Sequence, residues 1–347
     1  MSEFLKKNRY FIFCITIFLF FAAISYRDFL VTLKLMLFSS YNFSMLPFDE
    51  YYKFNLYFDG KISESPGYPW VSRYLANFVN YFFYKVFPCL TVSKIPIEIS
   101  KNVYCSFWSI ALANYTFTIL FQVSSFFYAF KILKRPFNES ILVGLISFFI
   151  ISLSDRYGVD RFSIFYISLF LIFSQKIYFK YLLILLSIFI NEKITIFIAS
   201  FYFCECYLNF HNRKNIQIFN FILPTILFGL YLFYFVLFDA SDNVFKIQNH
   251  LDGSIVDRSF ISFHGLANSF IPVFLVIFPY IYFYNKPNIL KKFRLNKISV
   301  IILLTFILLG FIGGGSGNTG RLVVYSSPIF ISTYGYFLFY LLKKFKL

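Results

Sequence analysis

Charged residues are scarce in this sequence, and their scarcity argues against a soluble protein. Only 14% of the 347 residues are Asp, Glu, Lys or Arg, while 59% are hydrophobic and 24% are aromatic. A water-soluble domain of this size could not cover so much apolar surface with so few polar side chains. The composition therefore predicts an integral membrane protein.

Cysteine is also rare, and its positions exclude the common metal motifs. None of the five cysteines has the spacing of a zinc site, and Cys204 and Cys206 cannot face each other on a helix. Cys89 and Cys105 flank one predicted outer segment, so a disulfide between them is one possibility.

The excess of positive charge does not indicate nucleic-acid binding. Lys and Arg number 32 against 16 Asp and Glu, but the basic residues are scattered in twos and threes between apolar runs. A nucleic-acid surface needs a basic patch or stripe. Short basic clusters are typical of membrane topology, because cytoplasmic loops are enriched in Lys and Arg. We therefore expect no nucleic-acid partner.

Apolar runs separated by polar breaks predict an all-α polytopic bundle of about ten transmembrane helices, forming a single domain over 1–347. The predicted spans are 10–25, 105–130, 138–153, 162–175, 177–190, 194–209, 216–238, 266–284, 298–312 and 322–342. Crossing a bilayer takes about 20 residues, so the shorter runs must include flanking positions. The stretch 71–87 has one apolar face and predicts an amphipathic helix on the membrane surface.

The charge distribution predicts that both termini lie in the cytoplasm. If 71–87 does not cross, the inner segments hold 18 of the 32 Lys and Arg, in agreement with the positive-inside rule. Thirteen of the sixteen Asp and Glu then fall outside. The first outer segment, 26–104, is too long for a simple connector and should contain interfacial helices. We expect a bacterial cytoplasmic membrane, surrounding lipids as partners, and chemistry on the outer face.

Two adjacent carboxylates stand in that outer segment, in LPFDEYYKF at 46–54. Asp49 or Glu50 could take the proton from an attacking hydroxyl, and together they could hold Mg²⁺ or Mn²⁺ through oxygen ligands. Tyr51 and Tyr52 offer ring faces and hydroxyls to a sugar. The alternative is that the two acids only cap a short interfacial helix.

A short outer turn, SDRYGVDR at 154–161, carries two Asp–Arg pairs. Asp155 or Asp160 could assist the base or the metal, while Arg156 or Arg161 binds a phosphate. Ionisable residues at the mouth of a membrane helix favour such a role. The alternative is that the pairs form salt bridges that only hold the hairpin together.

Two further polar sites interrupt apolar runs. Glu192 and Lys193 should face an internal cavity, where they could bind the substrate and its phosphate, unless they form a simple polar turn. The glycine-rich stretch 313–320 precedes Arg321 and could present N–H groups to an anion, although it lacks the Lys-Ser/Thr ending of an ATP-binding loop. Alternatively, Arg321 is a snorkelling side chain beside a turn.

The layout resembles the GT-C glycosyltransferases. The resemblance rests on DEYY at 49–52, followed by YPWVSRYL at 68–75 with Arg73, and covers the first third of the chain and the overall topology. It implies transfer of a sugar from a polyprenyl-phosphate carrier to an envelope glycan or lipid acceptor. One of the two acids would then be the base or a metal ligand, and Arg321 would contact the lipid-linked phosphate.

Other functions stay open at this stage. A weaker resemblance links the chain to polysaccharide polymerases of the Wzy or EpsG kind, which would depend on outer arginines more than on Asp49. A transporter or flippase of lipid-linked sugars is disfavoured, because no internal repeat is evident and polar residues cluster at helix ends. A non-enzymatic assembly or immunity protein is a further alternative.

Overall fold

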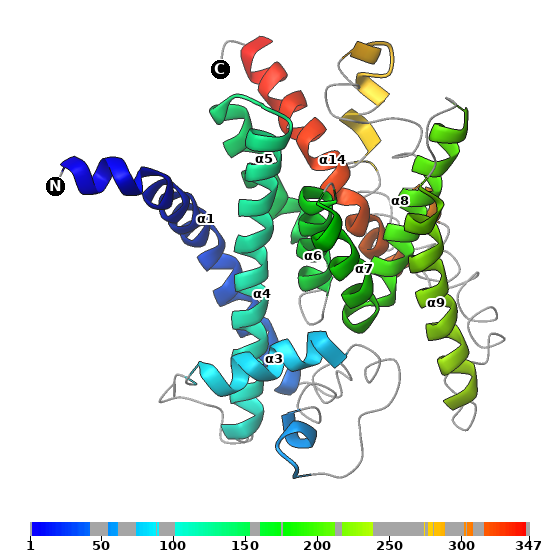
Figure 1. Cartoon of the computed structure of the whole chain (residues 1–347). Coiled ribbons are helices and arrows are strands. Elements are labelled where there is room, and N and C mark those ends of the chain that lie inside the picture. The colour runs from blue at the N-terminus through cyan, green and yellow to red at the C-terminus, as the bar shows by residue number, and fades with distance from the viewer. Residues whose placement is uncertain are drawn as a thin grey trace.

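The computed structural model describes residues 2–41, 55–61, 74–87, 89, 101–152, 160–174, 176–211, 217–238, 274, 277–279, 281–288, 302, 304–307 and 316–344. Within these residues the regular structure is helical and contains no strand, which confirms the all-α class (Figure 1). The main elements are α1 (Ser2–Tyr41), α3 (Tyr74–Val86), α4 (Lys101–Phe127), η2 (Tyr128–Ile132), α5 (Phe137–Ile151), α6 (Asp160–Phe173), α7 (Ile177–Ile190), α8 (Glu192–His211), α9 (Ile218–Phe238) and α14 (Ser316–Lys344).

The two ends of the chain depart most from the predicted boundaries. α1 continues as a helix to Tyr41, so the segment expected to leave the first span at residue 26 begins as helix. Asp28 is paired inside the bundle, and a charge that is paired there need not end a helix. α14 begins at Ser316, so Arg321 lies within a helix and not in the turn that was predicted before the last span.

Two helices are long and apolar enough to cross a membrane among the residues described. Their apolar stretches run over Tyr10–Val31 and Tyr104–Ile132. The apolar helices Phe137–Ile151, Ile177–Ile190 and Ile218–Phe233 are shorter than that length. The predicted spans 266–284 and 298–312 lie largely outside the described residues.

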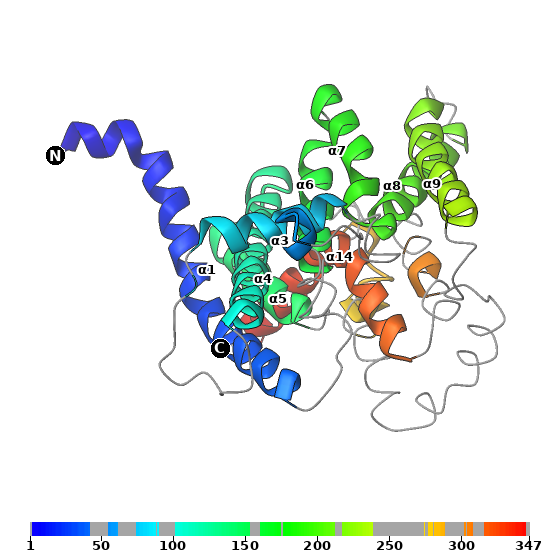
Figure 2. The same cartoon turned by 90° about the horizontal axis from the view of Figure 1, so that it is seen from below.

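α4 stands at the centre of the bundle. It packs against α1 through Ile119 and Phe126, against α5 and α14 through Phe121, and against α3 through Phe117. Figure 1 shows α1 and α5 flanking α4, with α3 lying across its lower part, and Figure 2 shows the same crossing from below. A long central helix of this kind positions side chains from all its neighbours.

α5 packs closely between α1 and α14. A Cβ added at Gly144 of α5 would lie 2.2 Å from the Phe21 ring of α1, and one added at Gly335 of α14 would lie 2.3 Å from a methyl of Val143. Small residues at such positions let helix backbones approach closely, as is common between helices in membranes.

The helices expose apolar side chains and bury polar ones. On α7, Leu182, Leu185 and Phe189 are exposed, while Lys180 and Ser187 are buried. This is the reverse of a soluble amphipathic helix, which places its charged residues outside. The chemistry-bearing groups of the molecule must therefore be sought inside the bundle.

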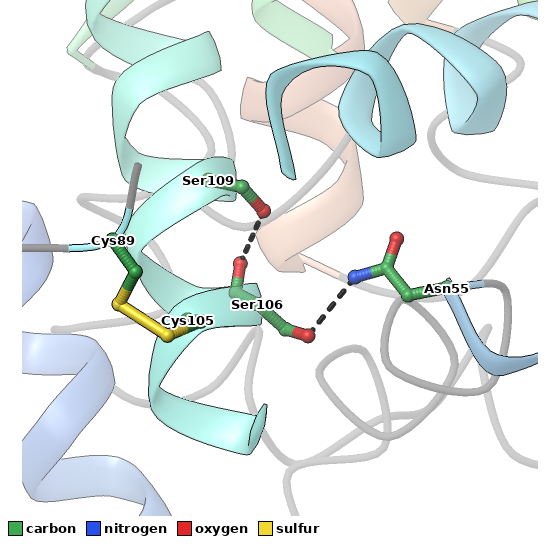
Figure 3. Close-up of a disulfide and its surroundings, with 5 residues drawn as sticks. All are labelled: Asn55, Cys89, Cys105, Ser106 and Ser109. Atoms are coloured by element: carbon green, nitrogen blue, oxygen red, sulfur yellow. Dashed lines mark hydrogen bonds between the residues drawn. A yellow bond between two sulfur atoms is a disulfide. The ribbon is translucent and has the colours of Figure 1, made fainter. Parts of the chain in front are cut away.

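The residues on both sides of α3 are tied to the start of α4, each by one contact shown in Figure 3. Cys89 and Cys105 form a disulfide, which decides the pairing that the sequence had left open. Asn55 donates a hydrogen bond from Nδ2 to the Ser106 hydroxyl, 2.9 Å away and buried. Both contacts reach the first turns of α4, so they hold α3 and the segment 55–61 against the helical bundle.

Removing the disulfide is expected to lower the free energy of unfolding by about 3 kcal/mol, because the cross-link spans 16 residues and restricts the unfolded chain. Thermal unfolding of Cys89→Ser in detergent would measure the loss. Reductant should destabilise the wild type to the same level and leave Cys89→Ser unchanged. The control Cys206→Ser removes a cysteine that is free and should match the wild type.

A second polar cluster ties α3 to the segment 55–61. The Asp59 carboxylate accepts hydrogen bonds from Tyr81 at 2.8 Å and Lys85 at 2.7 Å, and pairs with Lys61. Burial alone would raise the pKa of Asp59, but the hydrogen bonds from these three groups outweigh it, so its pKa lies below the ordinary 3.8. The contact with Asp59 also raises the pKa of Lys85.

This cluster predicts a small acid-dependent loss of stability. Because the pKa of Asp59 is lower in the folded chain, its contacts stabilise the fold above the unfolded value and are lost as pH falls through the folded value. The partners are partly exposed, so we expect Asp59→Asn to cost at most about 1 kcal/mol near neutral pH. The melting temperatures of the wild type and of Asp59→Asn should converge well below pH 3.8. A difference that persists there would contradict the assignment.

Candidate functional site

A buried polar junction forms where α6 begins. Asp160 and Arg161, the first two residues of α6, have no exposed surface. Their side chains reach different neighbours, since Asp160 contacts α14 while Arg161 contacts α1 and α4. One Asp–Arg pair of the predicted turn thus lies inside the bundle and joins four helices.

Arg161 forms a buried ion pair with Asp28 of α1. Its Nη1 donates to Asp28 Oδ2 at 2.7 Å and to the Thr118 hydroxyl of α4 at 2.8 Å. The Thr118 hydroxyl in turn donates to the Asn114 carbonyl at 2.8 Å. A buried charge is tolerated only when paired and hydrogen-bonded, and Asp28 supplies that pairing across 133 positions of sequence.

Arg161 keeps donors that have no acceptor among the described residues. Within that part of the chain its buried Nε and Nη2 form no hydrogen bond, and the same holds for Gln122 Nε2, one turn further along α4 from Thr118. The carbonyl oxygen of Gln122 is occupied, because it accepts from Ser25 of α1. Buried donors without partners are costly, and a ligand oxygen would satisfy them.

Asp160 is linked to the break between α7 and α8 through Tyr325 of α14. The Tyr325 hydroxyl donates to Asp160 Oδ1 and accepts from Asn191 Nδ2 at 2.9 Å. Asn191 Nδ2 also lies 3.2 Å from the Ser163 hydroxyl of α6. All four side chains are fully buried, so the carboxylate is held in a fixed orientation.

Lys193 approaches the same tyrosine from α8. Asn191 lies just before this helix, and its Oδ1 accepts a hydrogen bond from the Lys193 backbone N–H at 3.1 Å, which caps the first turn. The Lys193 ammonium lies 5.5 Å from the centre of the Tyr325 ring, within cation–π distance. Glu192 and Lys193, which follow Asn191 in the chain, are half-buried.

The structure therefore brings together three of the predicted site residues, namely Asp160, Arg161 and Lys193. Arg321 lies on the first turns of the helix that carries Tyr325, and only its backbone is described. The other predicted site residues lie outside the described residues: Asp49, Glu50, Tyr51, Tyr52, Arg73, Asp155 and Arg156.

Sequence reasoning missed several members of the junction, among them Asp28, Thr118, Gln122 and Tyr325. One signal was available on α4, where Asn114, Thr118 and Gln122 recur every four residues and so form a polar stripe along an apolar helix. The other members could not be found this way, because Asp28 stands beside Arg27 where an apolar run ends, and Tyr325 is one of 28 tyrosines in the chain.

No group of three or more His, Cys, Asp or Glu side chains that could hold a metal occurs in the part of the chain that the structure describes. Asp49 and Glu50, the predicted Mg²⁺ or Mn²⁺ ligands, are not in that part. Within the junction, Asp28 and Asp160 each bind a donor already, which makes them poor candidates for a cation site.

Comparisons with protein-family models, with curated proteins and with solved structures found no match to this chain. The function must therefore be inferred from the junction and from the polarity of the helices.

Proposed function

We propose that the chain is a multi-pass membrane glycosyltransferase that moves a sugar from a polyprenyl-phosphate carrier to a glycan or lipid acceptor. The observation that supports it most directly is the buried Arg161, whose Nε and Nη2 groups lack acceptors, next to the buried carboxylate of Asp160. A phosphate oxygen suits such donors, because guanidinium and phosphate form charge-assisted hydrogen bonds in matching geometry.

Asp160 and Arg161 would have different roles in the transfer reaction. The acceptor hydroxyl oxygen attacks C1 of the sugar, and the bond between C1 and the phosphate oxygen breaks. The electron pair of that bond stays with the phosphate, whose increased charge Arg161 stabilises. Asp160 takes the hydroxyl proton, and Tyr325 orients its carboxylate through the hydrogen bond to Oδ1.

The membrane part of the proposal is supported by the polarity of the helices. α7 turns Leu182 and Leu185 outward and Lys180 inward, as expected of a helix whose surroundings are lipid. We propose about ten spans in the bacterial cytoplasmic membrane, with both termini in the cytoplasm. α1 begins and α14 ends toward the same end of the molecule in Figure 1, as that topology requires.

A polysaccharide polymerase is the second candidate, and one observation favours it. The residue with unsatisfied donors at the junction is an arginine, which is the residue type that such a polymerase was expected to depend on. Both candidates break the same kind of bond between sugar and phosphate, so they differ in what is transferred, a single sugar or a growing chain.

The decisive experiment is a transfer assay in liposomes. The purified chain would be given a polyprenyl-phosphate donor labelled in the sugar, with extracted envelope glycans and lipids as acceptors, with and without EDTA. We expect label in one acceptor class and release of unlabelled polyprenyl phosphate. Loss of transfer in EDTA would support the predicted divalent cation.

Three other outcomes would contradict the proposal. Transfer from a nucleotide sugar supplied in place of the lipid-linked donor, with none from the lipid-linked donor itself, would exclude the lipid carrier as donor. A ladder of products that differ by whole repeat units would identify the polymerase. Movement of intact donor across the bilayer, with no new glycosidic bond, would identify a flippase.

A further inference from the structure

A second polar site lies at the opposite end of α7 from the junction. A cavity of about 660 Å³ opens between the start of α7, the second half of α8 and the start of α9. Figures 1 and 2 show these three helices side by side. Lys180 lines the cavity and Asn191 belongs to the junction, so eleven residues of helix place the two sites about 16 Å apart along the axis.

The cavity is lined by one basic and one acidic side chain, which interact electrostatically but form no direct ion pair among the described residues. Lys180 and Glu205 both line it, and in the described part of the chain neither forms an ion pair. Lys180 is only 6% exposed and is held in place, because its Nζ donates to Asn220 Oδ1 at 2.8 Å and lies 4.5 Å from the centre of the Tyr181 ring. The site as a whole is electrically neutral but carries two separated charges.

The remaining polar groups are preorganised and partly unsatisfied. Asn220 accepts from Tyr181 at 3.0 Å and donates to Gln217 at 2.7 Å, so its amide is fixed. The Tyr202 hydroxyl, by contrast, has no hydrogen-bond partner in the part of the chain that the structure describes, although its residue is 2% exposed. A buried hydroxyl that lines a cavity and lacks a partner is a natural contact for a ligand oxygen.

Large apolar side chains surround the cavity and face outward. Tyr178 is 88% exposed, and Ile177, Phe179, Ile218 and Phe219 are more than half exposed. Aromatic and aliphatic side chains of this kind, next to charged groups, are typical of the level at which lipid head groups meet acyl chains. A ligand in this cavity would therefore have a charged end inside and an apolar part against these residues.

We propose that this cavity binds the head group of a phospholipid that carries both a phosphate and a primary ammonium. Lys180 and the Tyr202 hydroxyl bind the phosphate oxygens, Glu205 binds the ammonium, and the acyl chains lie against the outward-facing apolar residues. A neutral sugar would leave the two charges of the cavity unmatched. The inference rests on the membrane location that we propose for the chain and not on its sugar-transfer activity.

Native mass spectrometry of the full chain can test this in nanodiscs that contain dioleoyl phosphatidylethanolamine, phosphatidylcholine or phosphatidylglycerol. Phosphatidylcholine has no N–H donors for Glu205, and phosphatidylglycerol has no cation. We expect phosphatidylethanolamine to be retained about tenfold better than either, as one charge-assisted hydrogen bond is worth that factor. Equal retention of the three lipids by the wild type would overturn the proposal, whatever the variants do.

Variants of Lys180 and Glu205 test the role of each residue in lipid binding. Glu205→Gln should remove the preference for phosphatidylethanolamine over phosphatidylcholine, and Lys180→Gln should weaken retention of both. Lys176→Gln is the matched control, because Lys176 is an exposed lysine one turn earlier that does not line the cavity. A preference that survives Glu205→Gln would overturn the assignment. Lipid retention by a chain that transfers no sugar would leave this inference standing while the proposed function fails.

Discussion

Replacing Arg161 with glutamine is expected to lower the free energy of unfolding by about 3–5 kcal/mol. The substitution leaves the Asp28 carboxylate buried without its cation, and it removes the donor to the Thr118 hydroxyl. Desolvation of an unpaired charge dominates the cost, because Asp28 is buried and loses its cation. Urea unfolding of the purified protein, followed by circular dichroism, would measure the change.

Two further variants test whether the loss of stability comes from the buried pair of Arg161 with Asp28. Asp28→Leu combined with Arg161→Met removes both charges and should recover most of the lost stability. Lys85→Gln removes a cation from a partly exposed pair and should cost at most about 1 kcal/mol. An effect of Arg161→Gln as small as that of Lys85→Gln would mean that the pair with Asp28 is not buried in solution.

Replacing Asp160 with asparagine is expected to reduce the rate of sugar transfer roughly a hundredfold to ten-thousandfold, the contribution typical of a general base. Asparagine has the same shape and still offers an oxygen to the Tyr325 hydroxyl, but it cannot take a proton from the acceptor. Turnover in the liposome assay gives the rate, and the melting temperature should change little.

Tyr325→Phe separates positioning from proton transfer. It removes the hydroxyl between Asp160 and Asn191 but leaves the carboxylate, so we expect a smaller loss of rate and a shifted pH profile. Full activity in Asp160→Asn, together with loss of activity in Asp49→Asn, would move the base to the segment 46–54 and reduce the junction to a structural role.

Helix positions could be predicted where an apolar run is bounded by clear polar breaks. α7 has the predicted bounds, and α9 begins two residues after the predicted start. The prediction failed at α1, because Arg27 and Asp28 look like the end of a span when their partners are unknown. Composition tells where polar residues interrupt an apolar run but not whether a distant helix pairs with them.

The candidate site was predictable only in part for the same reason. The charges at the start of α6 and the polar step before α8 stand out in the sequence. The structure brings Asp160 and Lys193 to one tyrosine, with Arg161 next to Asp160 on α6. That tyrosine, and the carboxylate that pairs with Arg161, come from the two terminal helices. Contacts of such long separation depend on how helices pack, which no local pattern encodes.

The cross-link between Cys89 and Cys105 has a consequence for how the chain must be inserted during biogenesis. Thiol oxidation is sustained outside the cytosol and reversed within it, so this bond can persist only if the end bearing α3 is translocated. Cys206, which remains a thiol, lies near the cavity lined by Lys180, because its Sγ donates to the backbone carbonyl of Gln217. Alkylation of intact cells with an impermeant maleimide, before and after reduction, would therefore report the orientation directly.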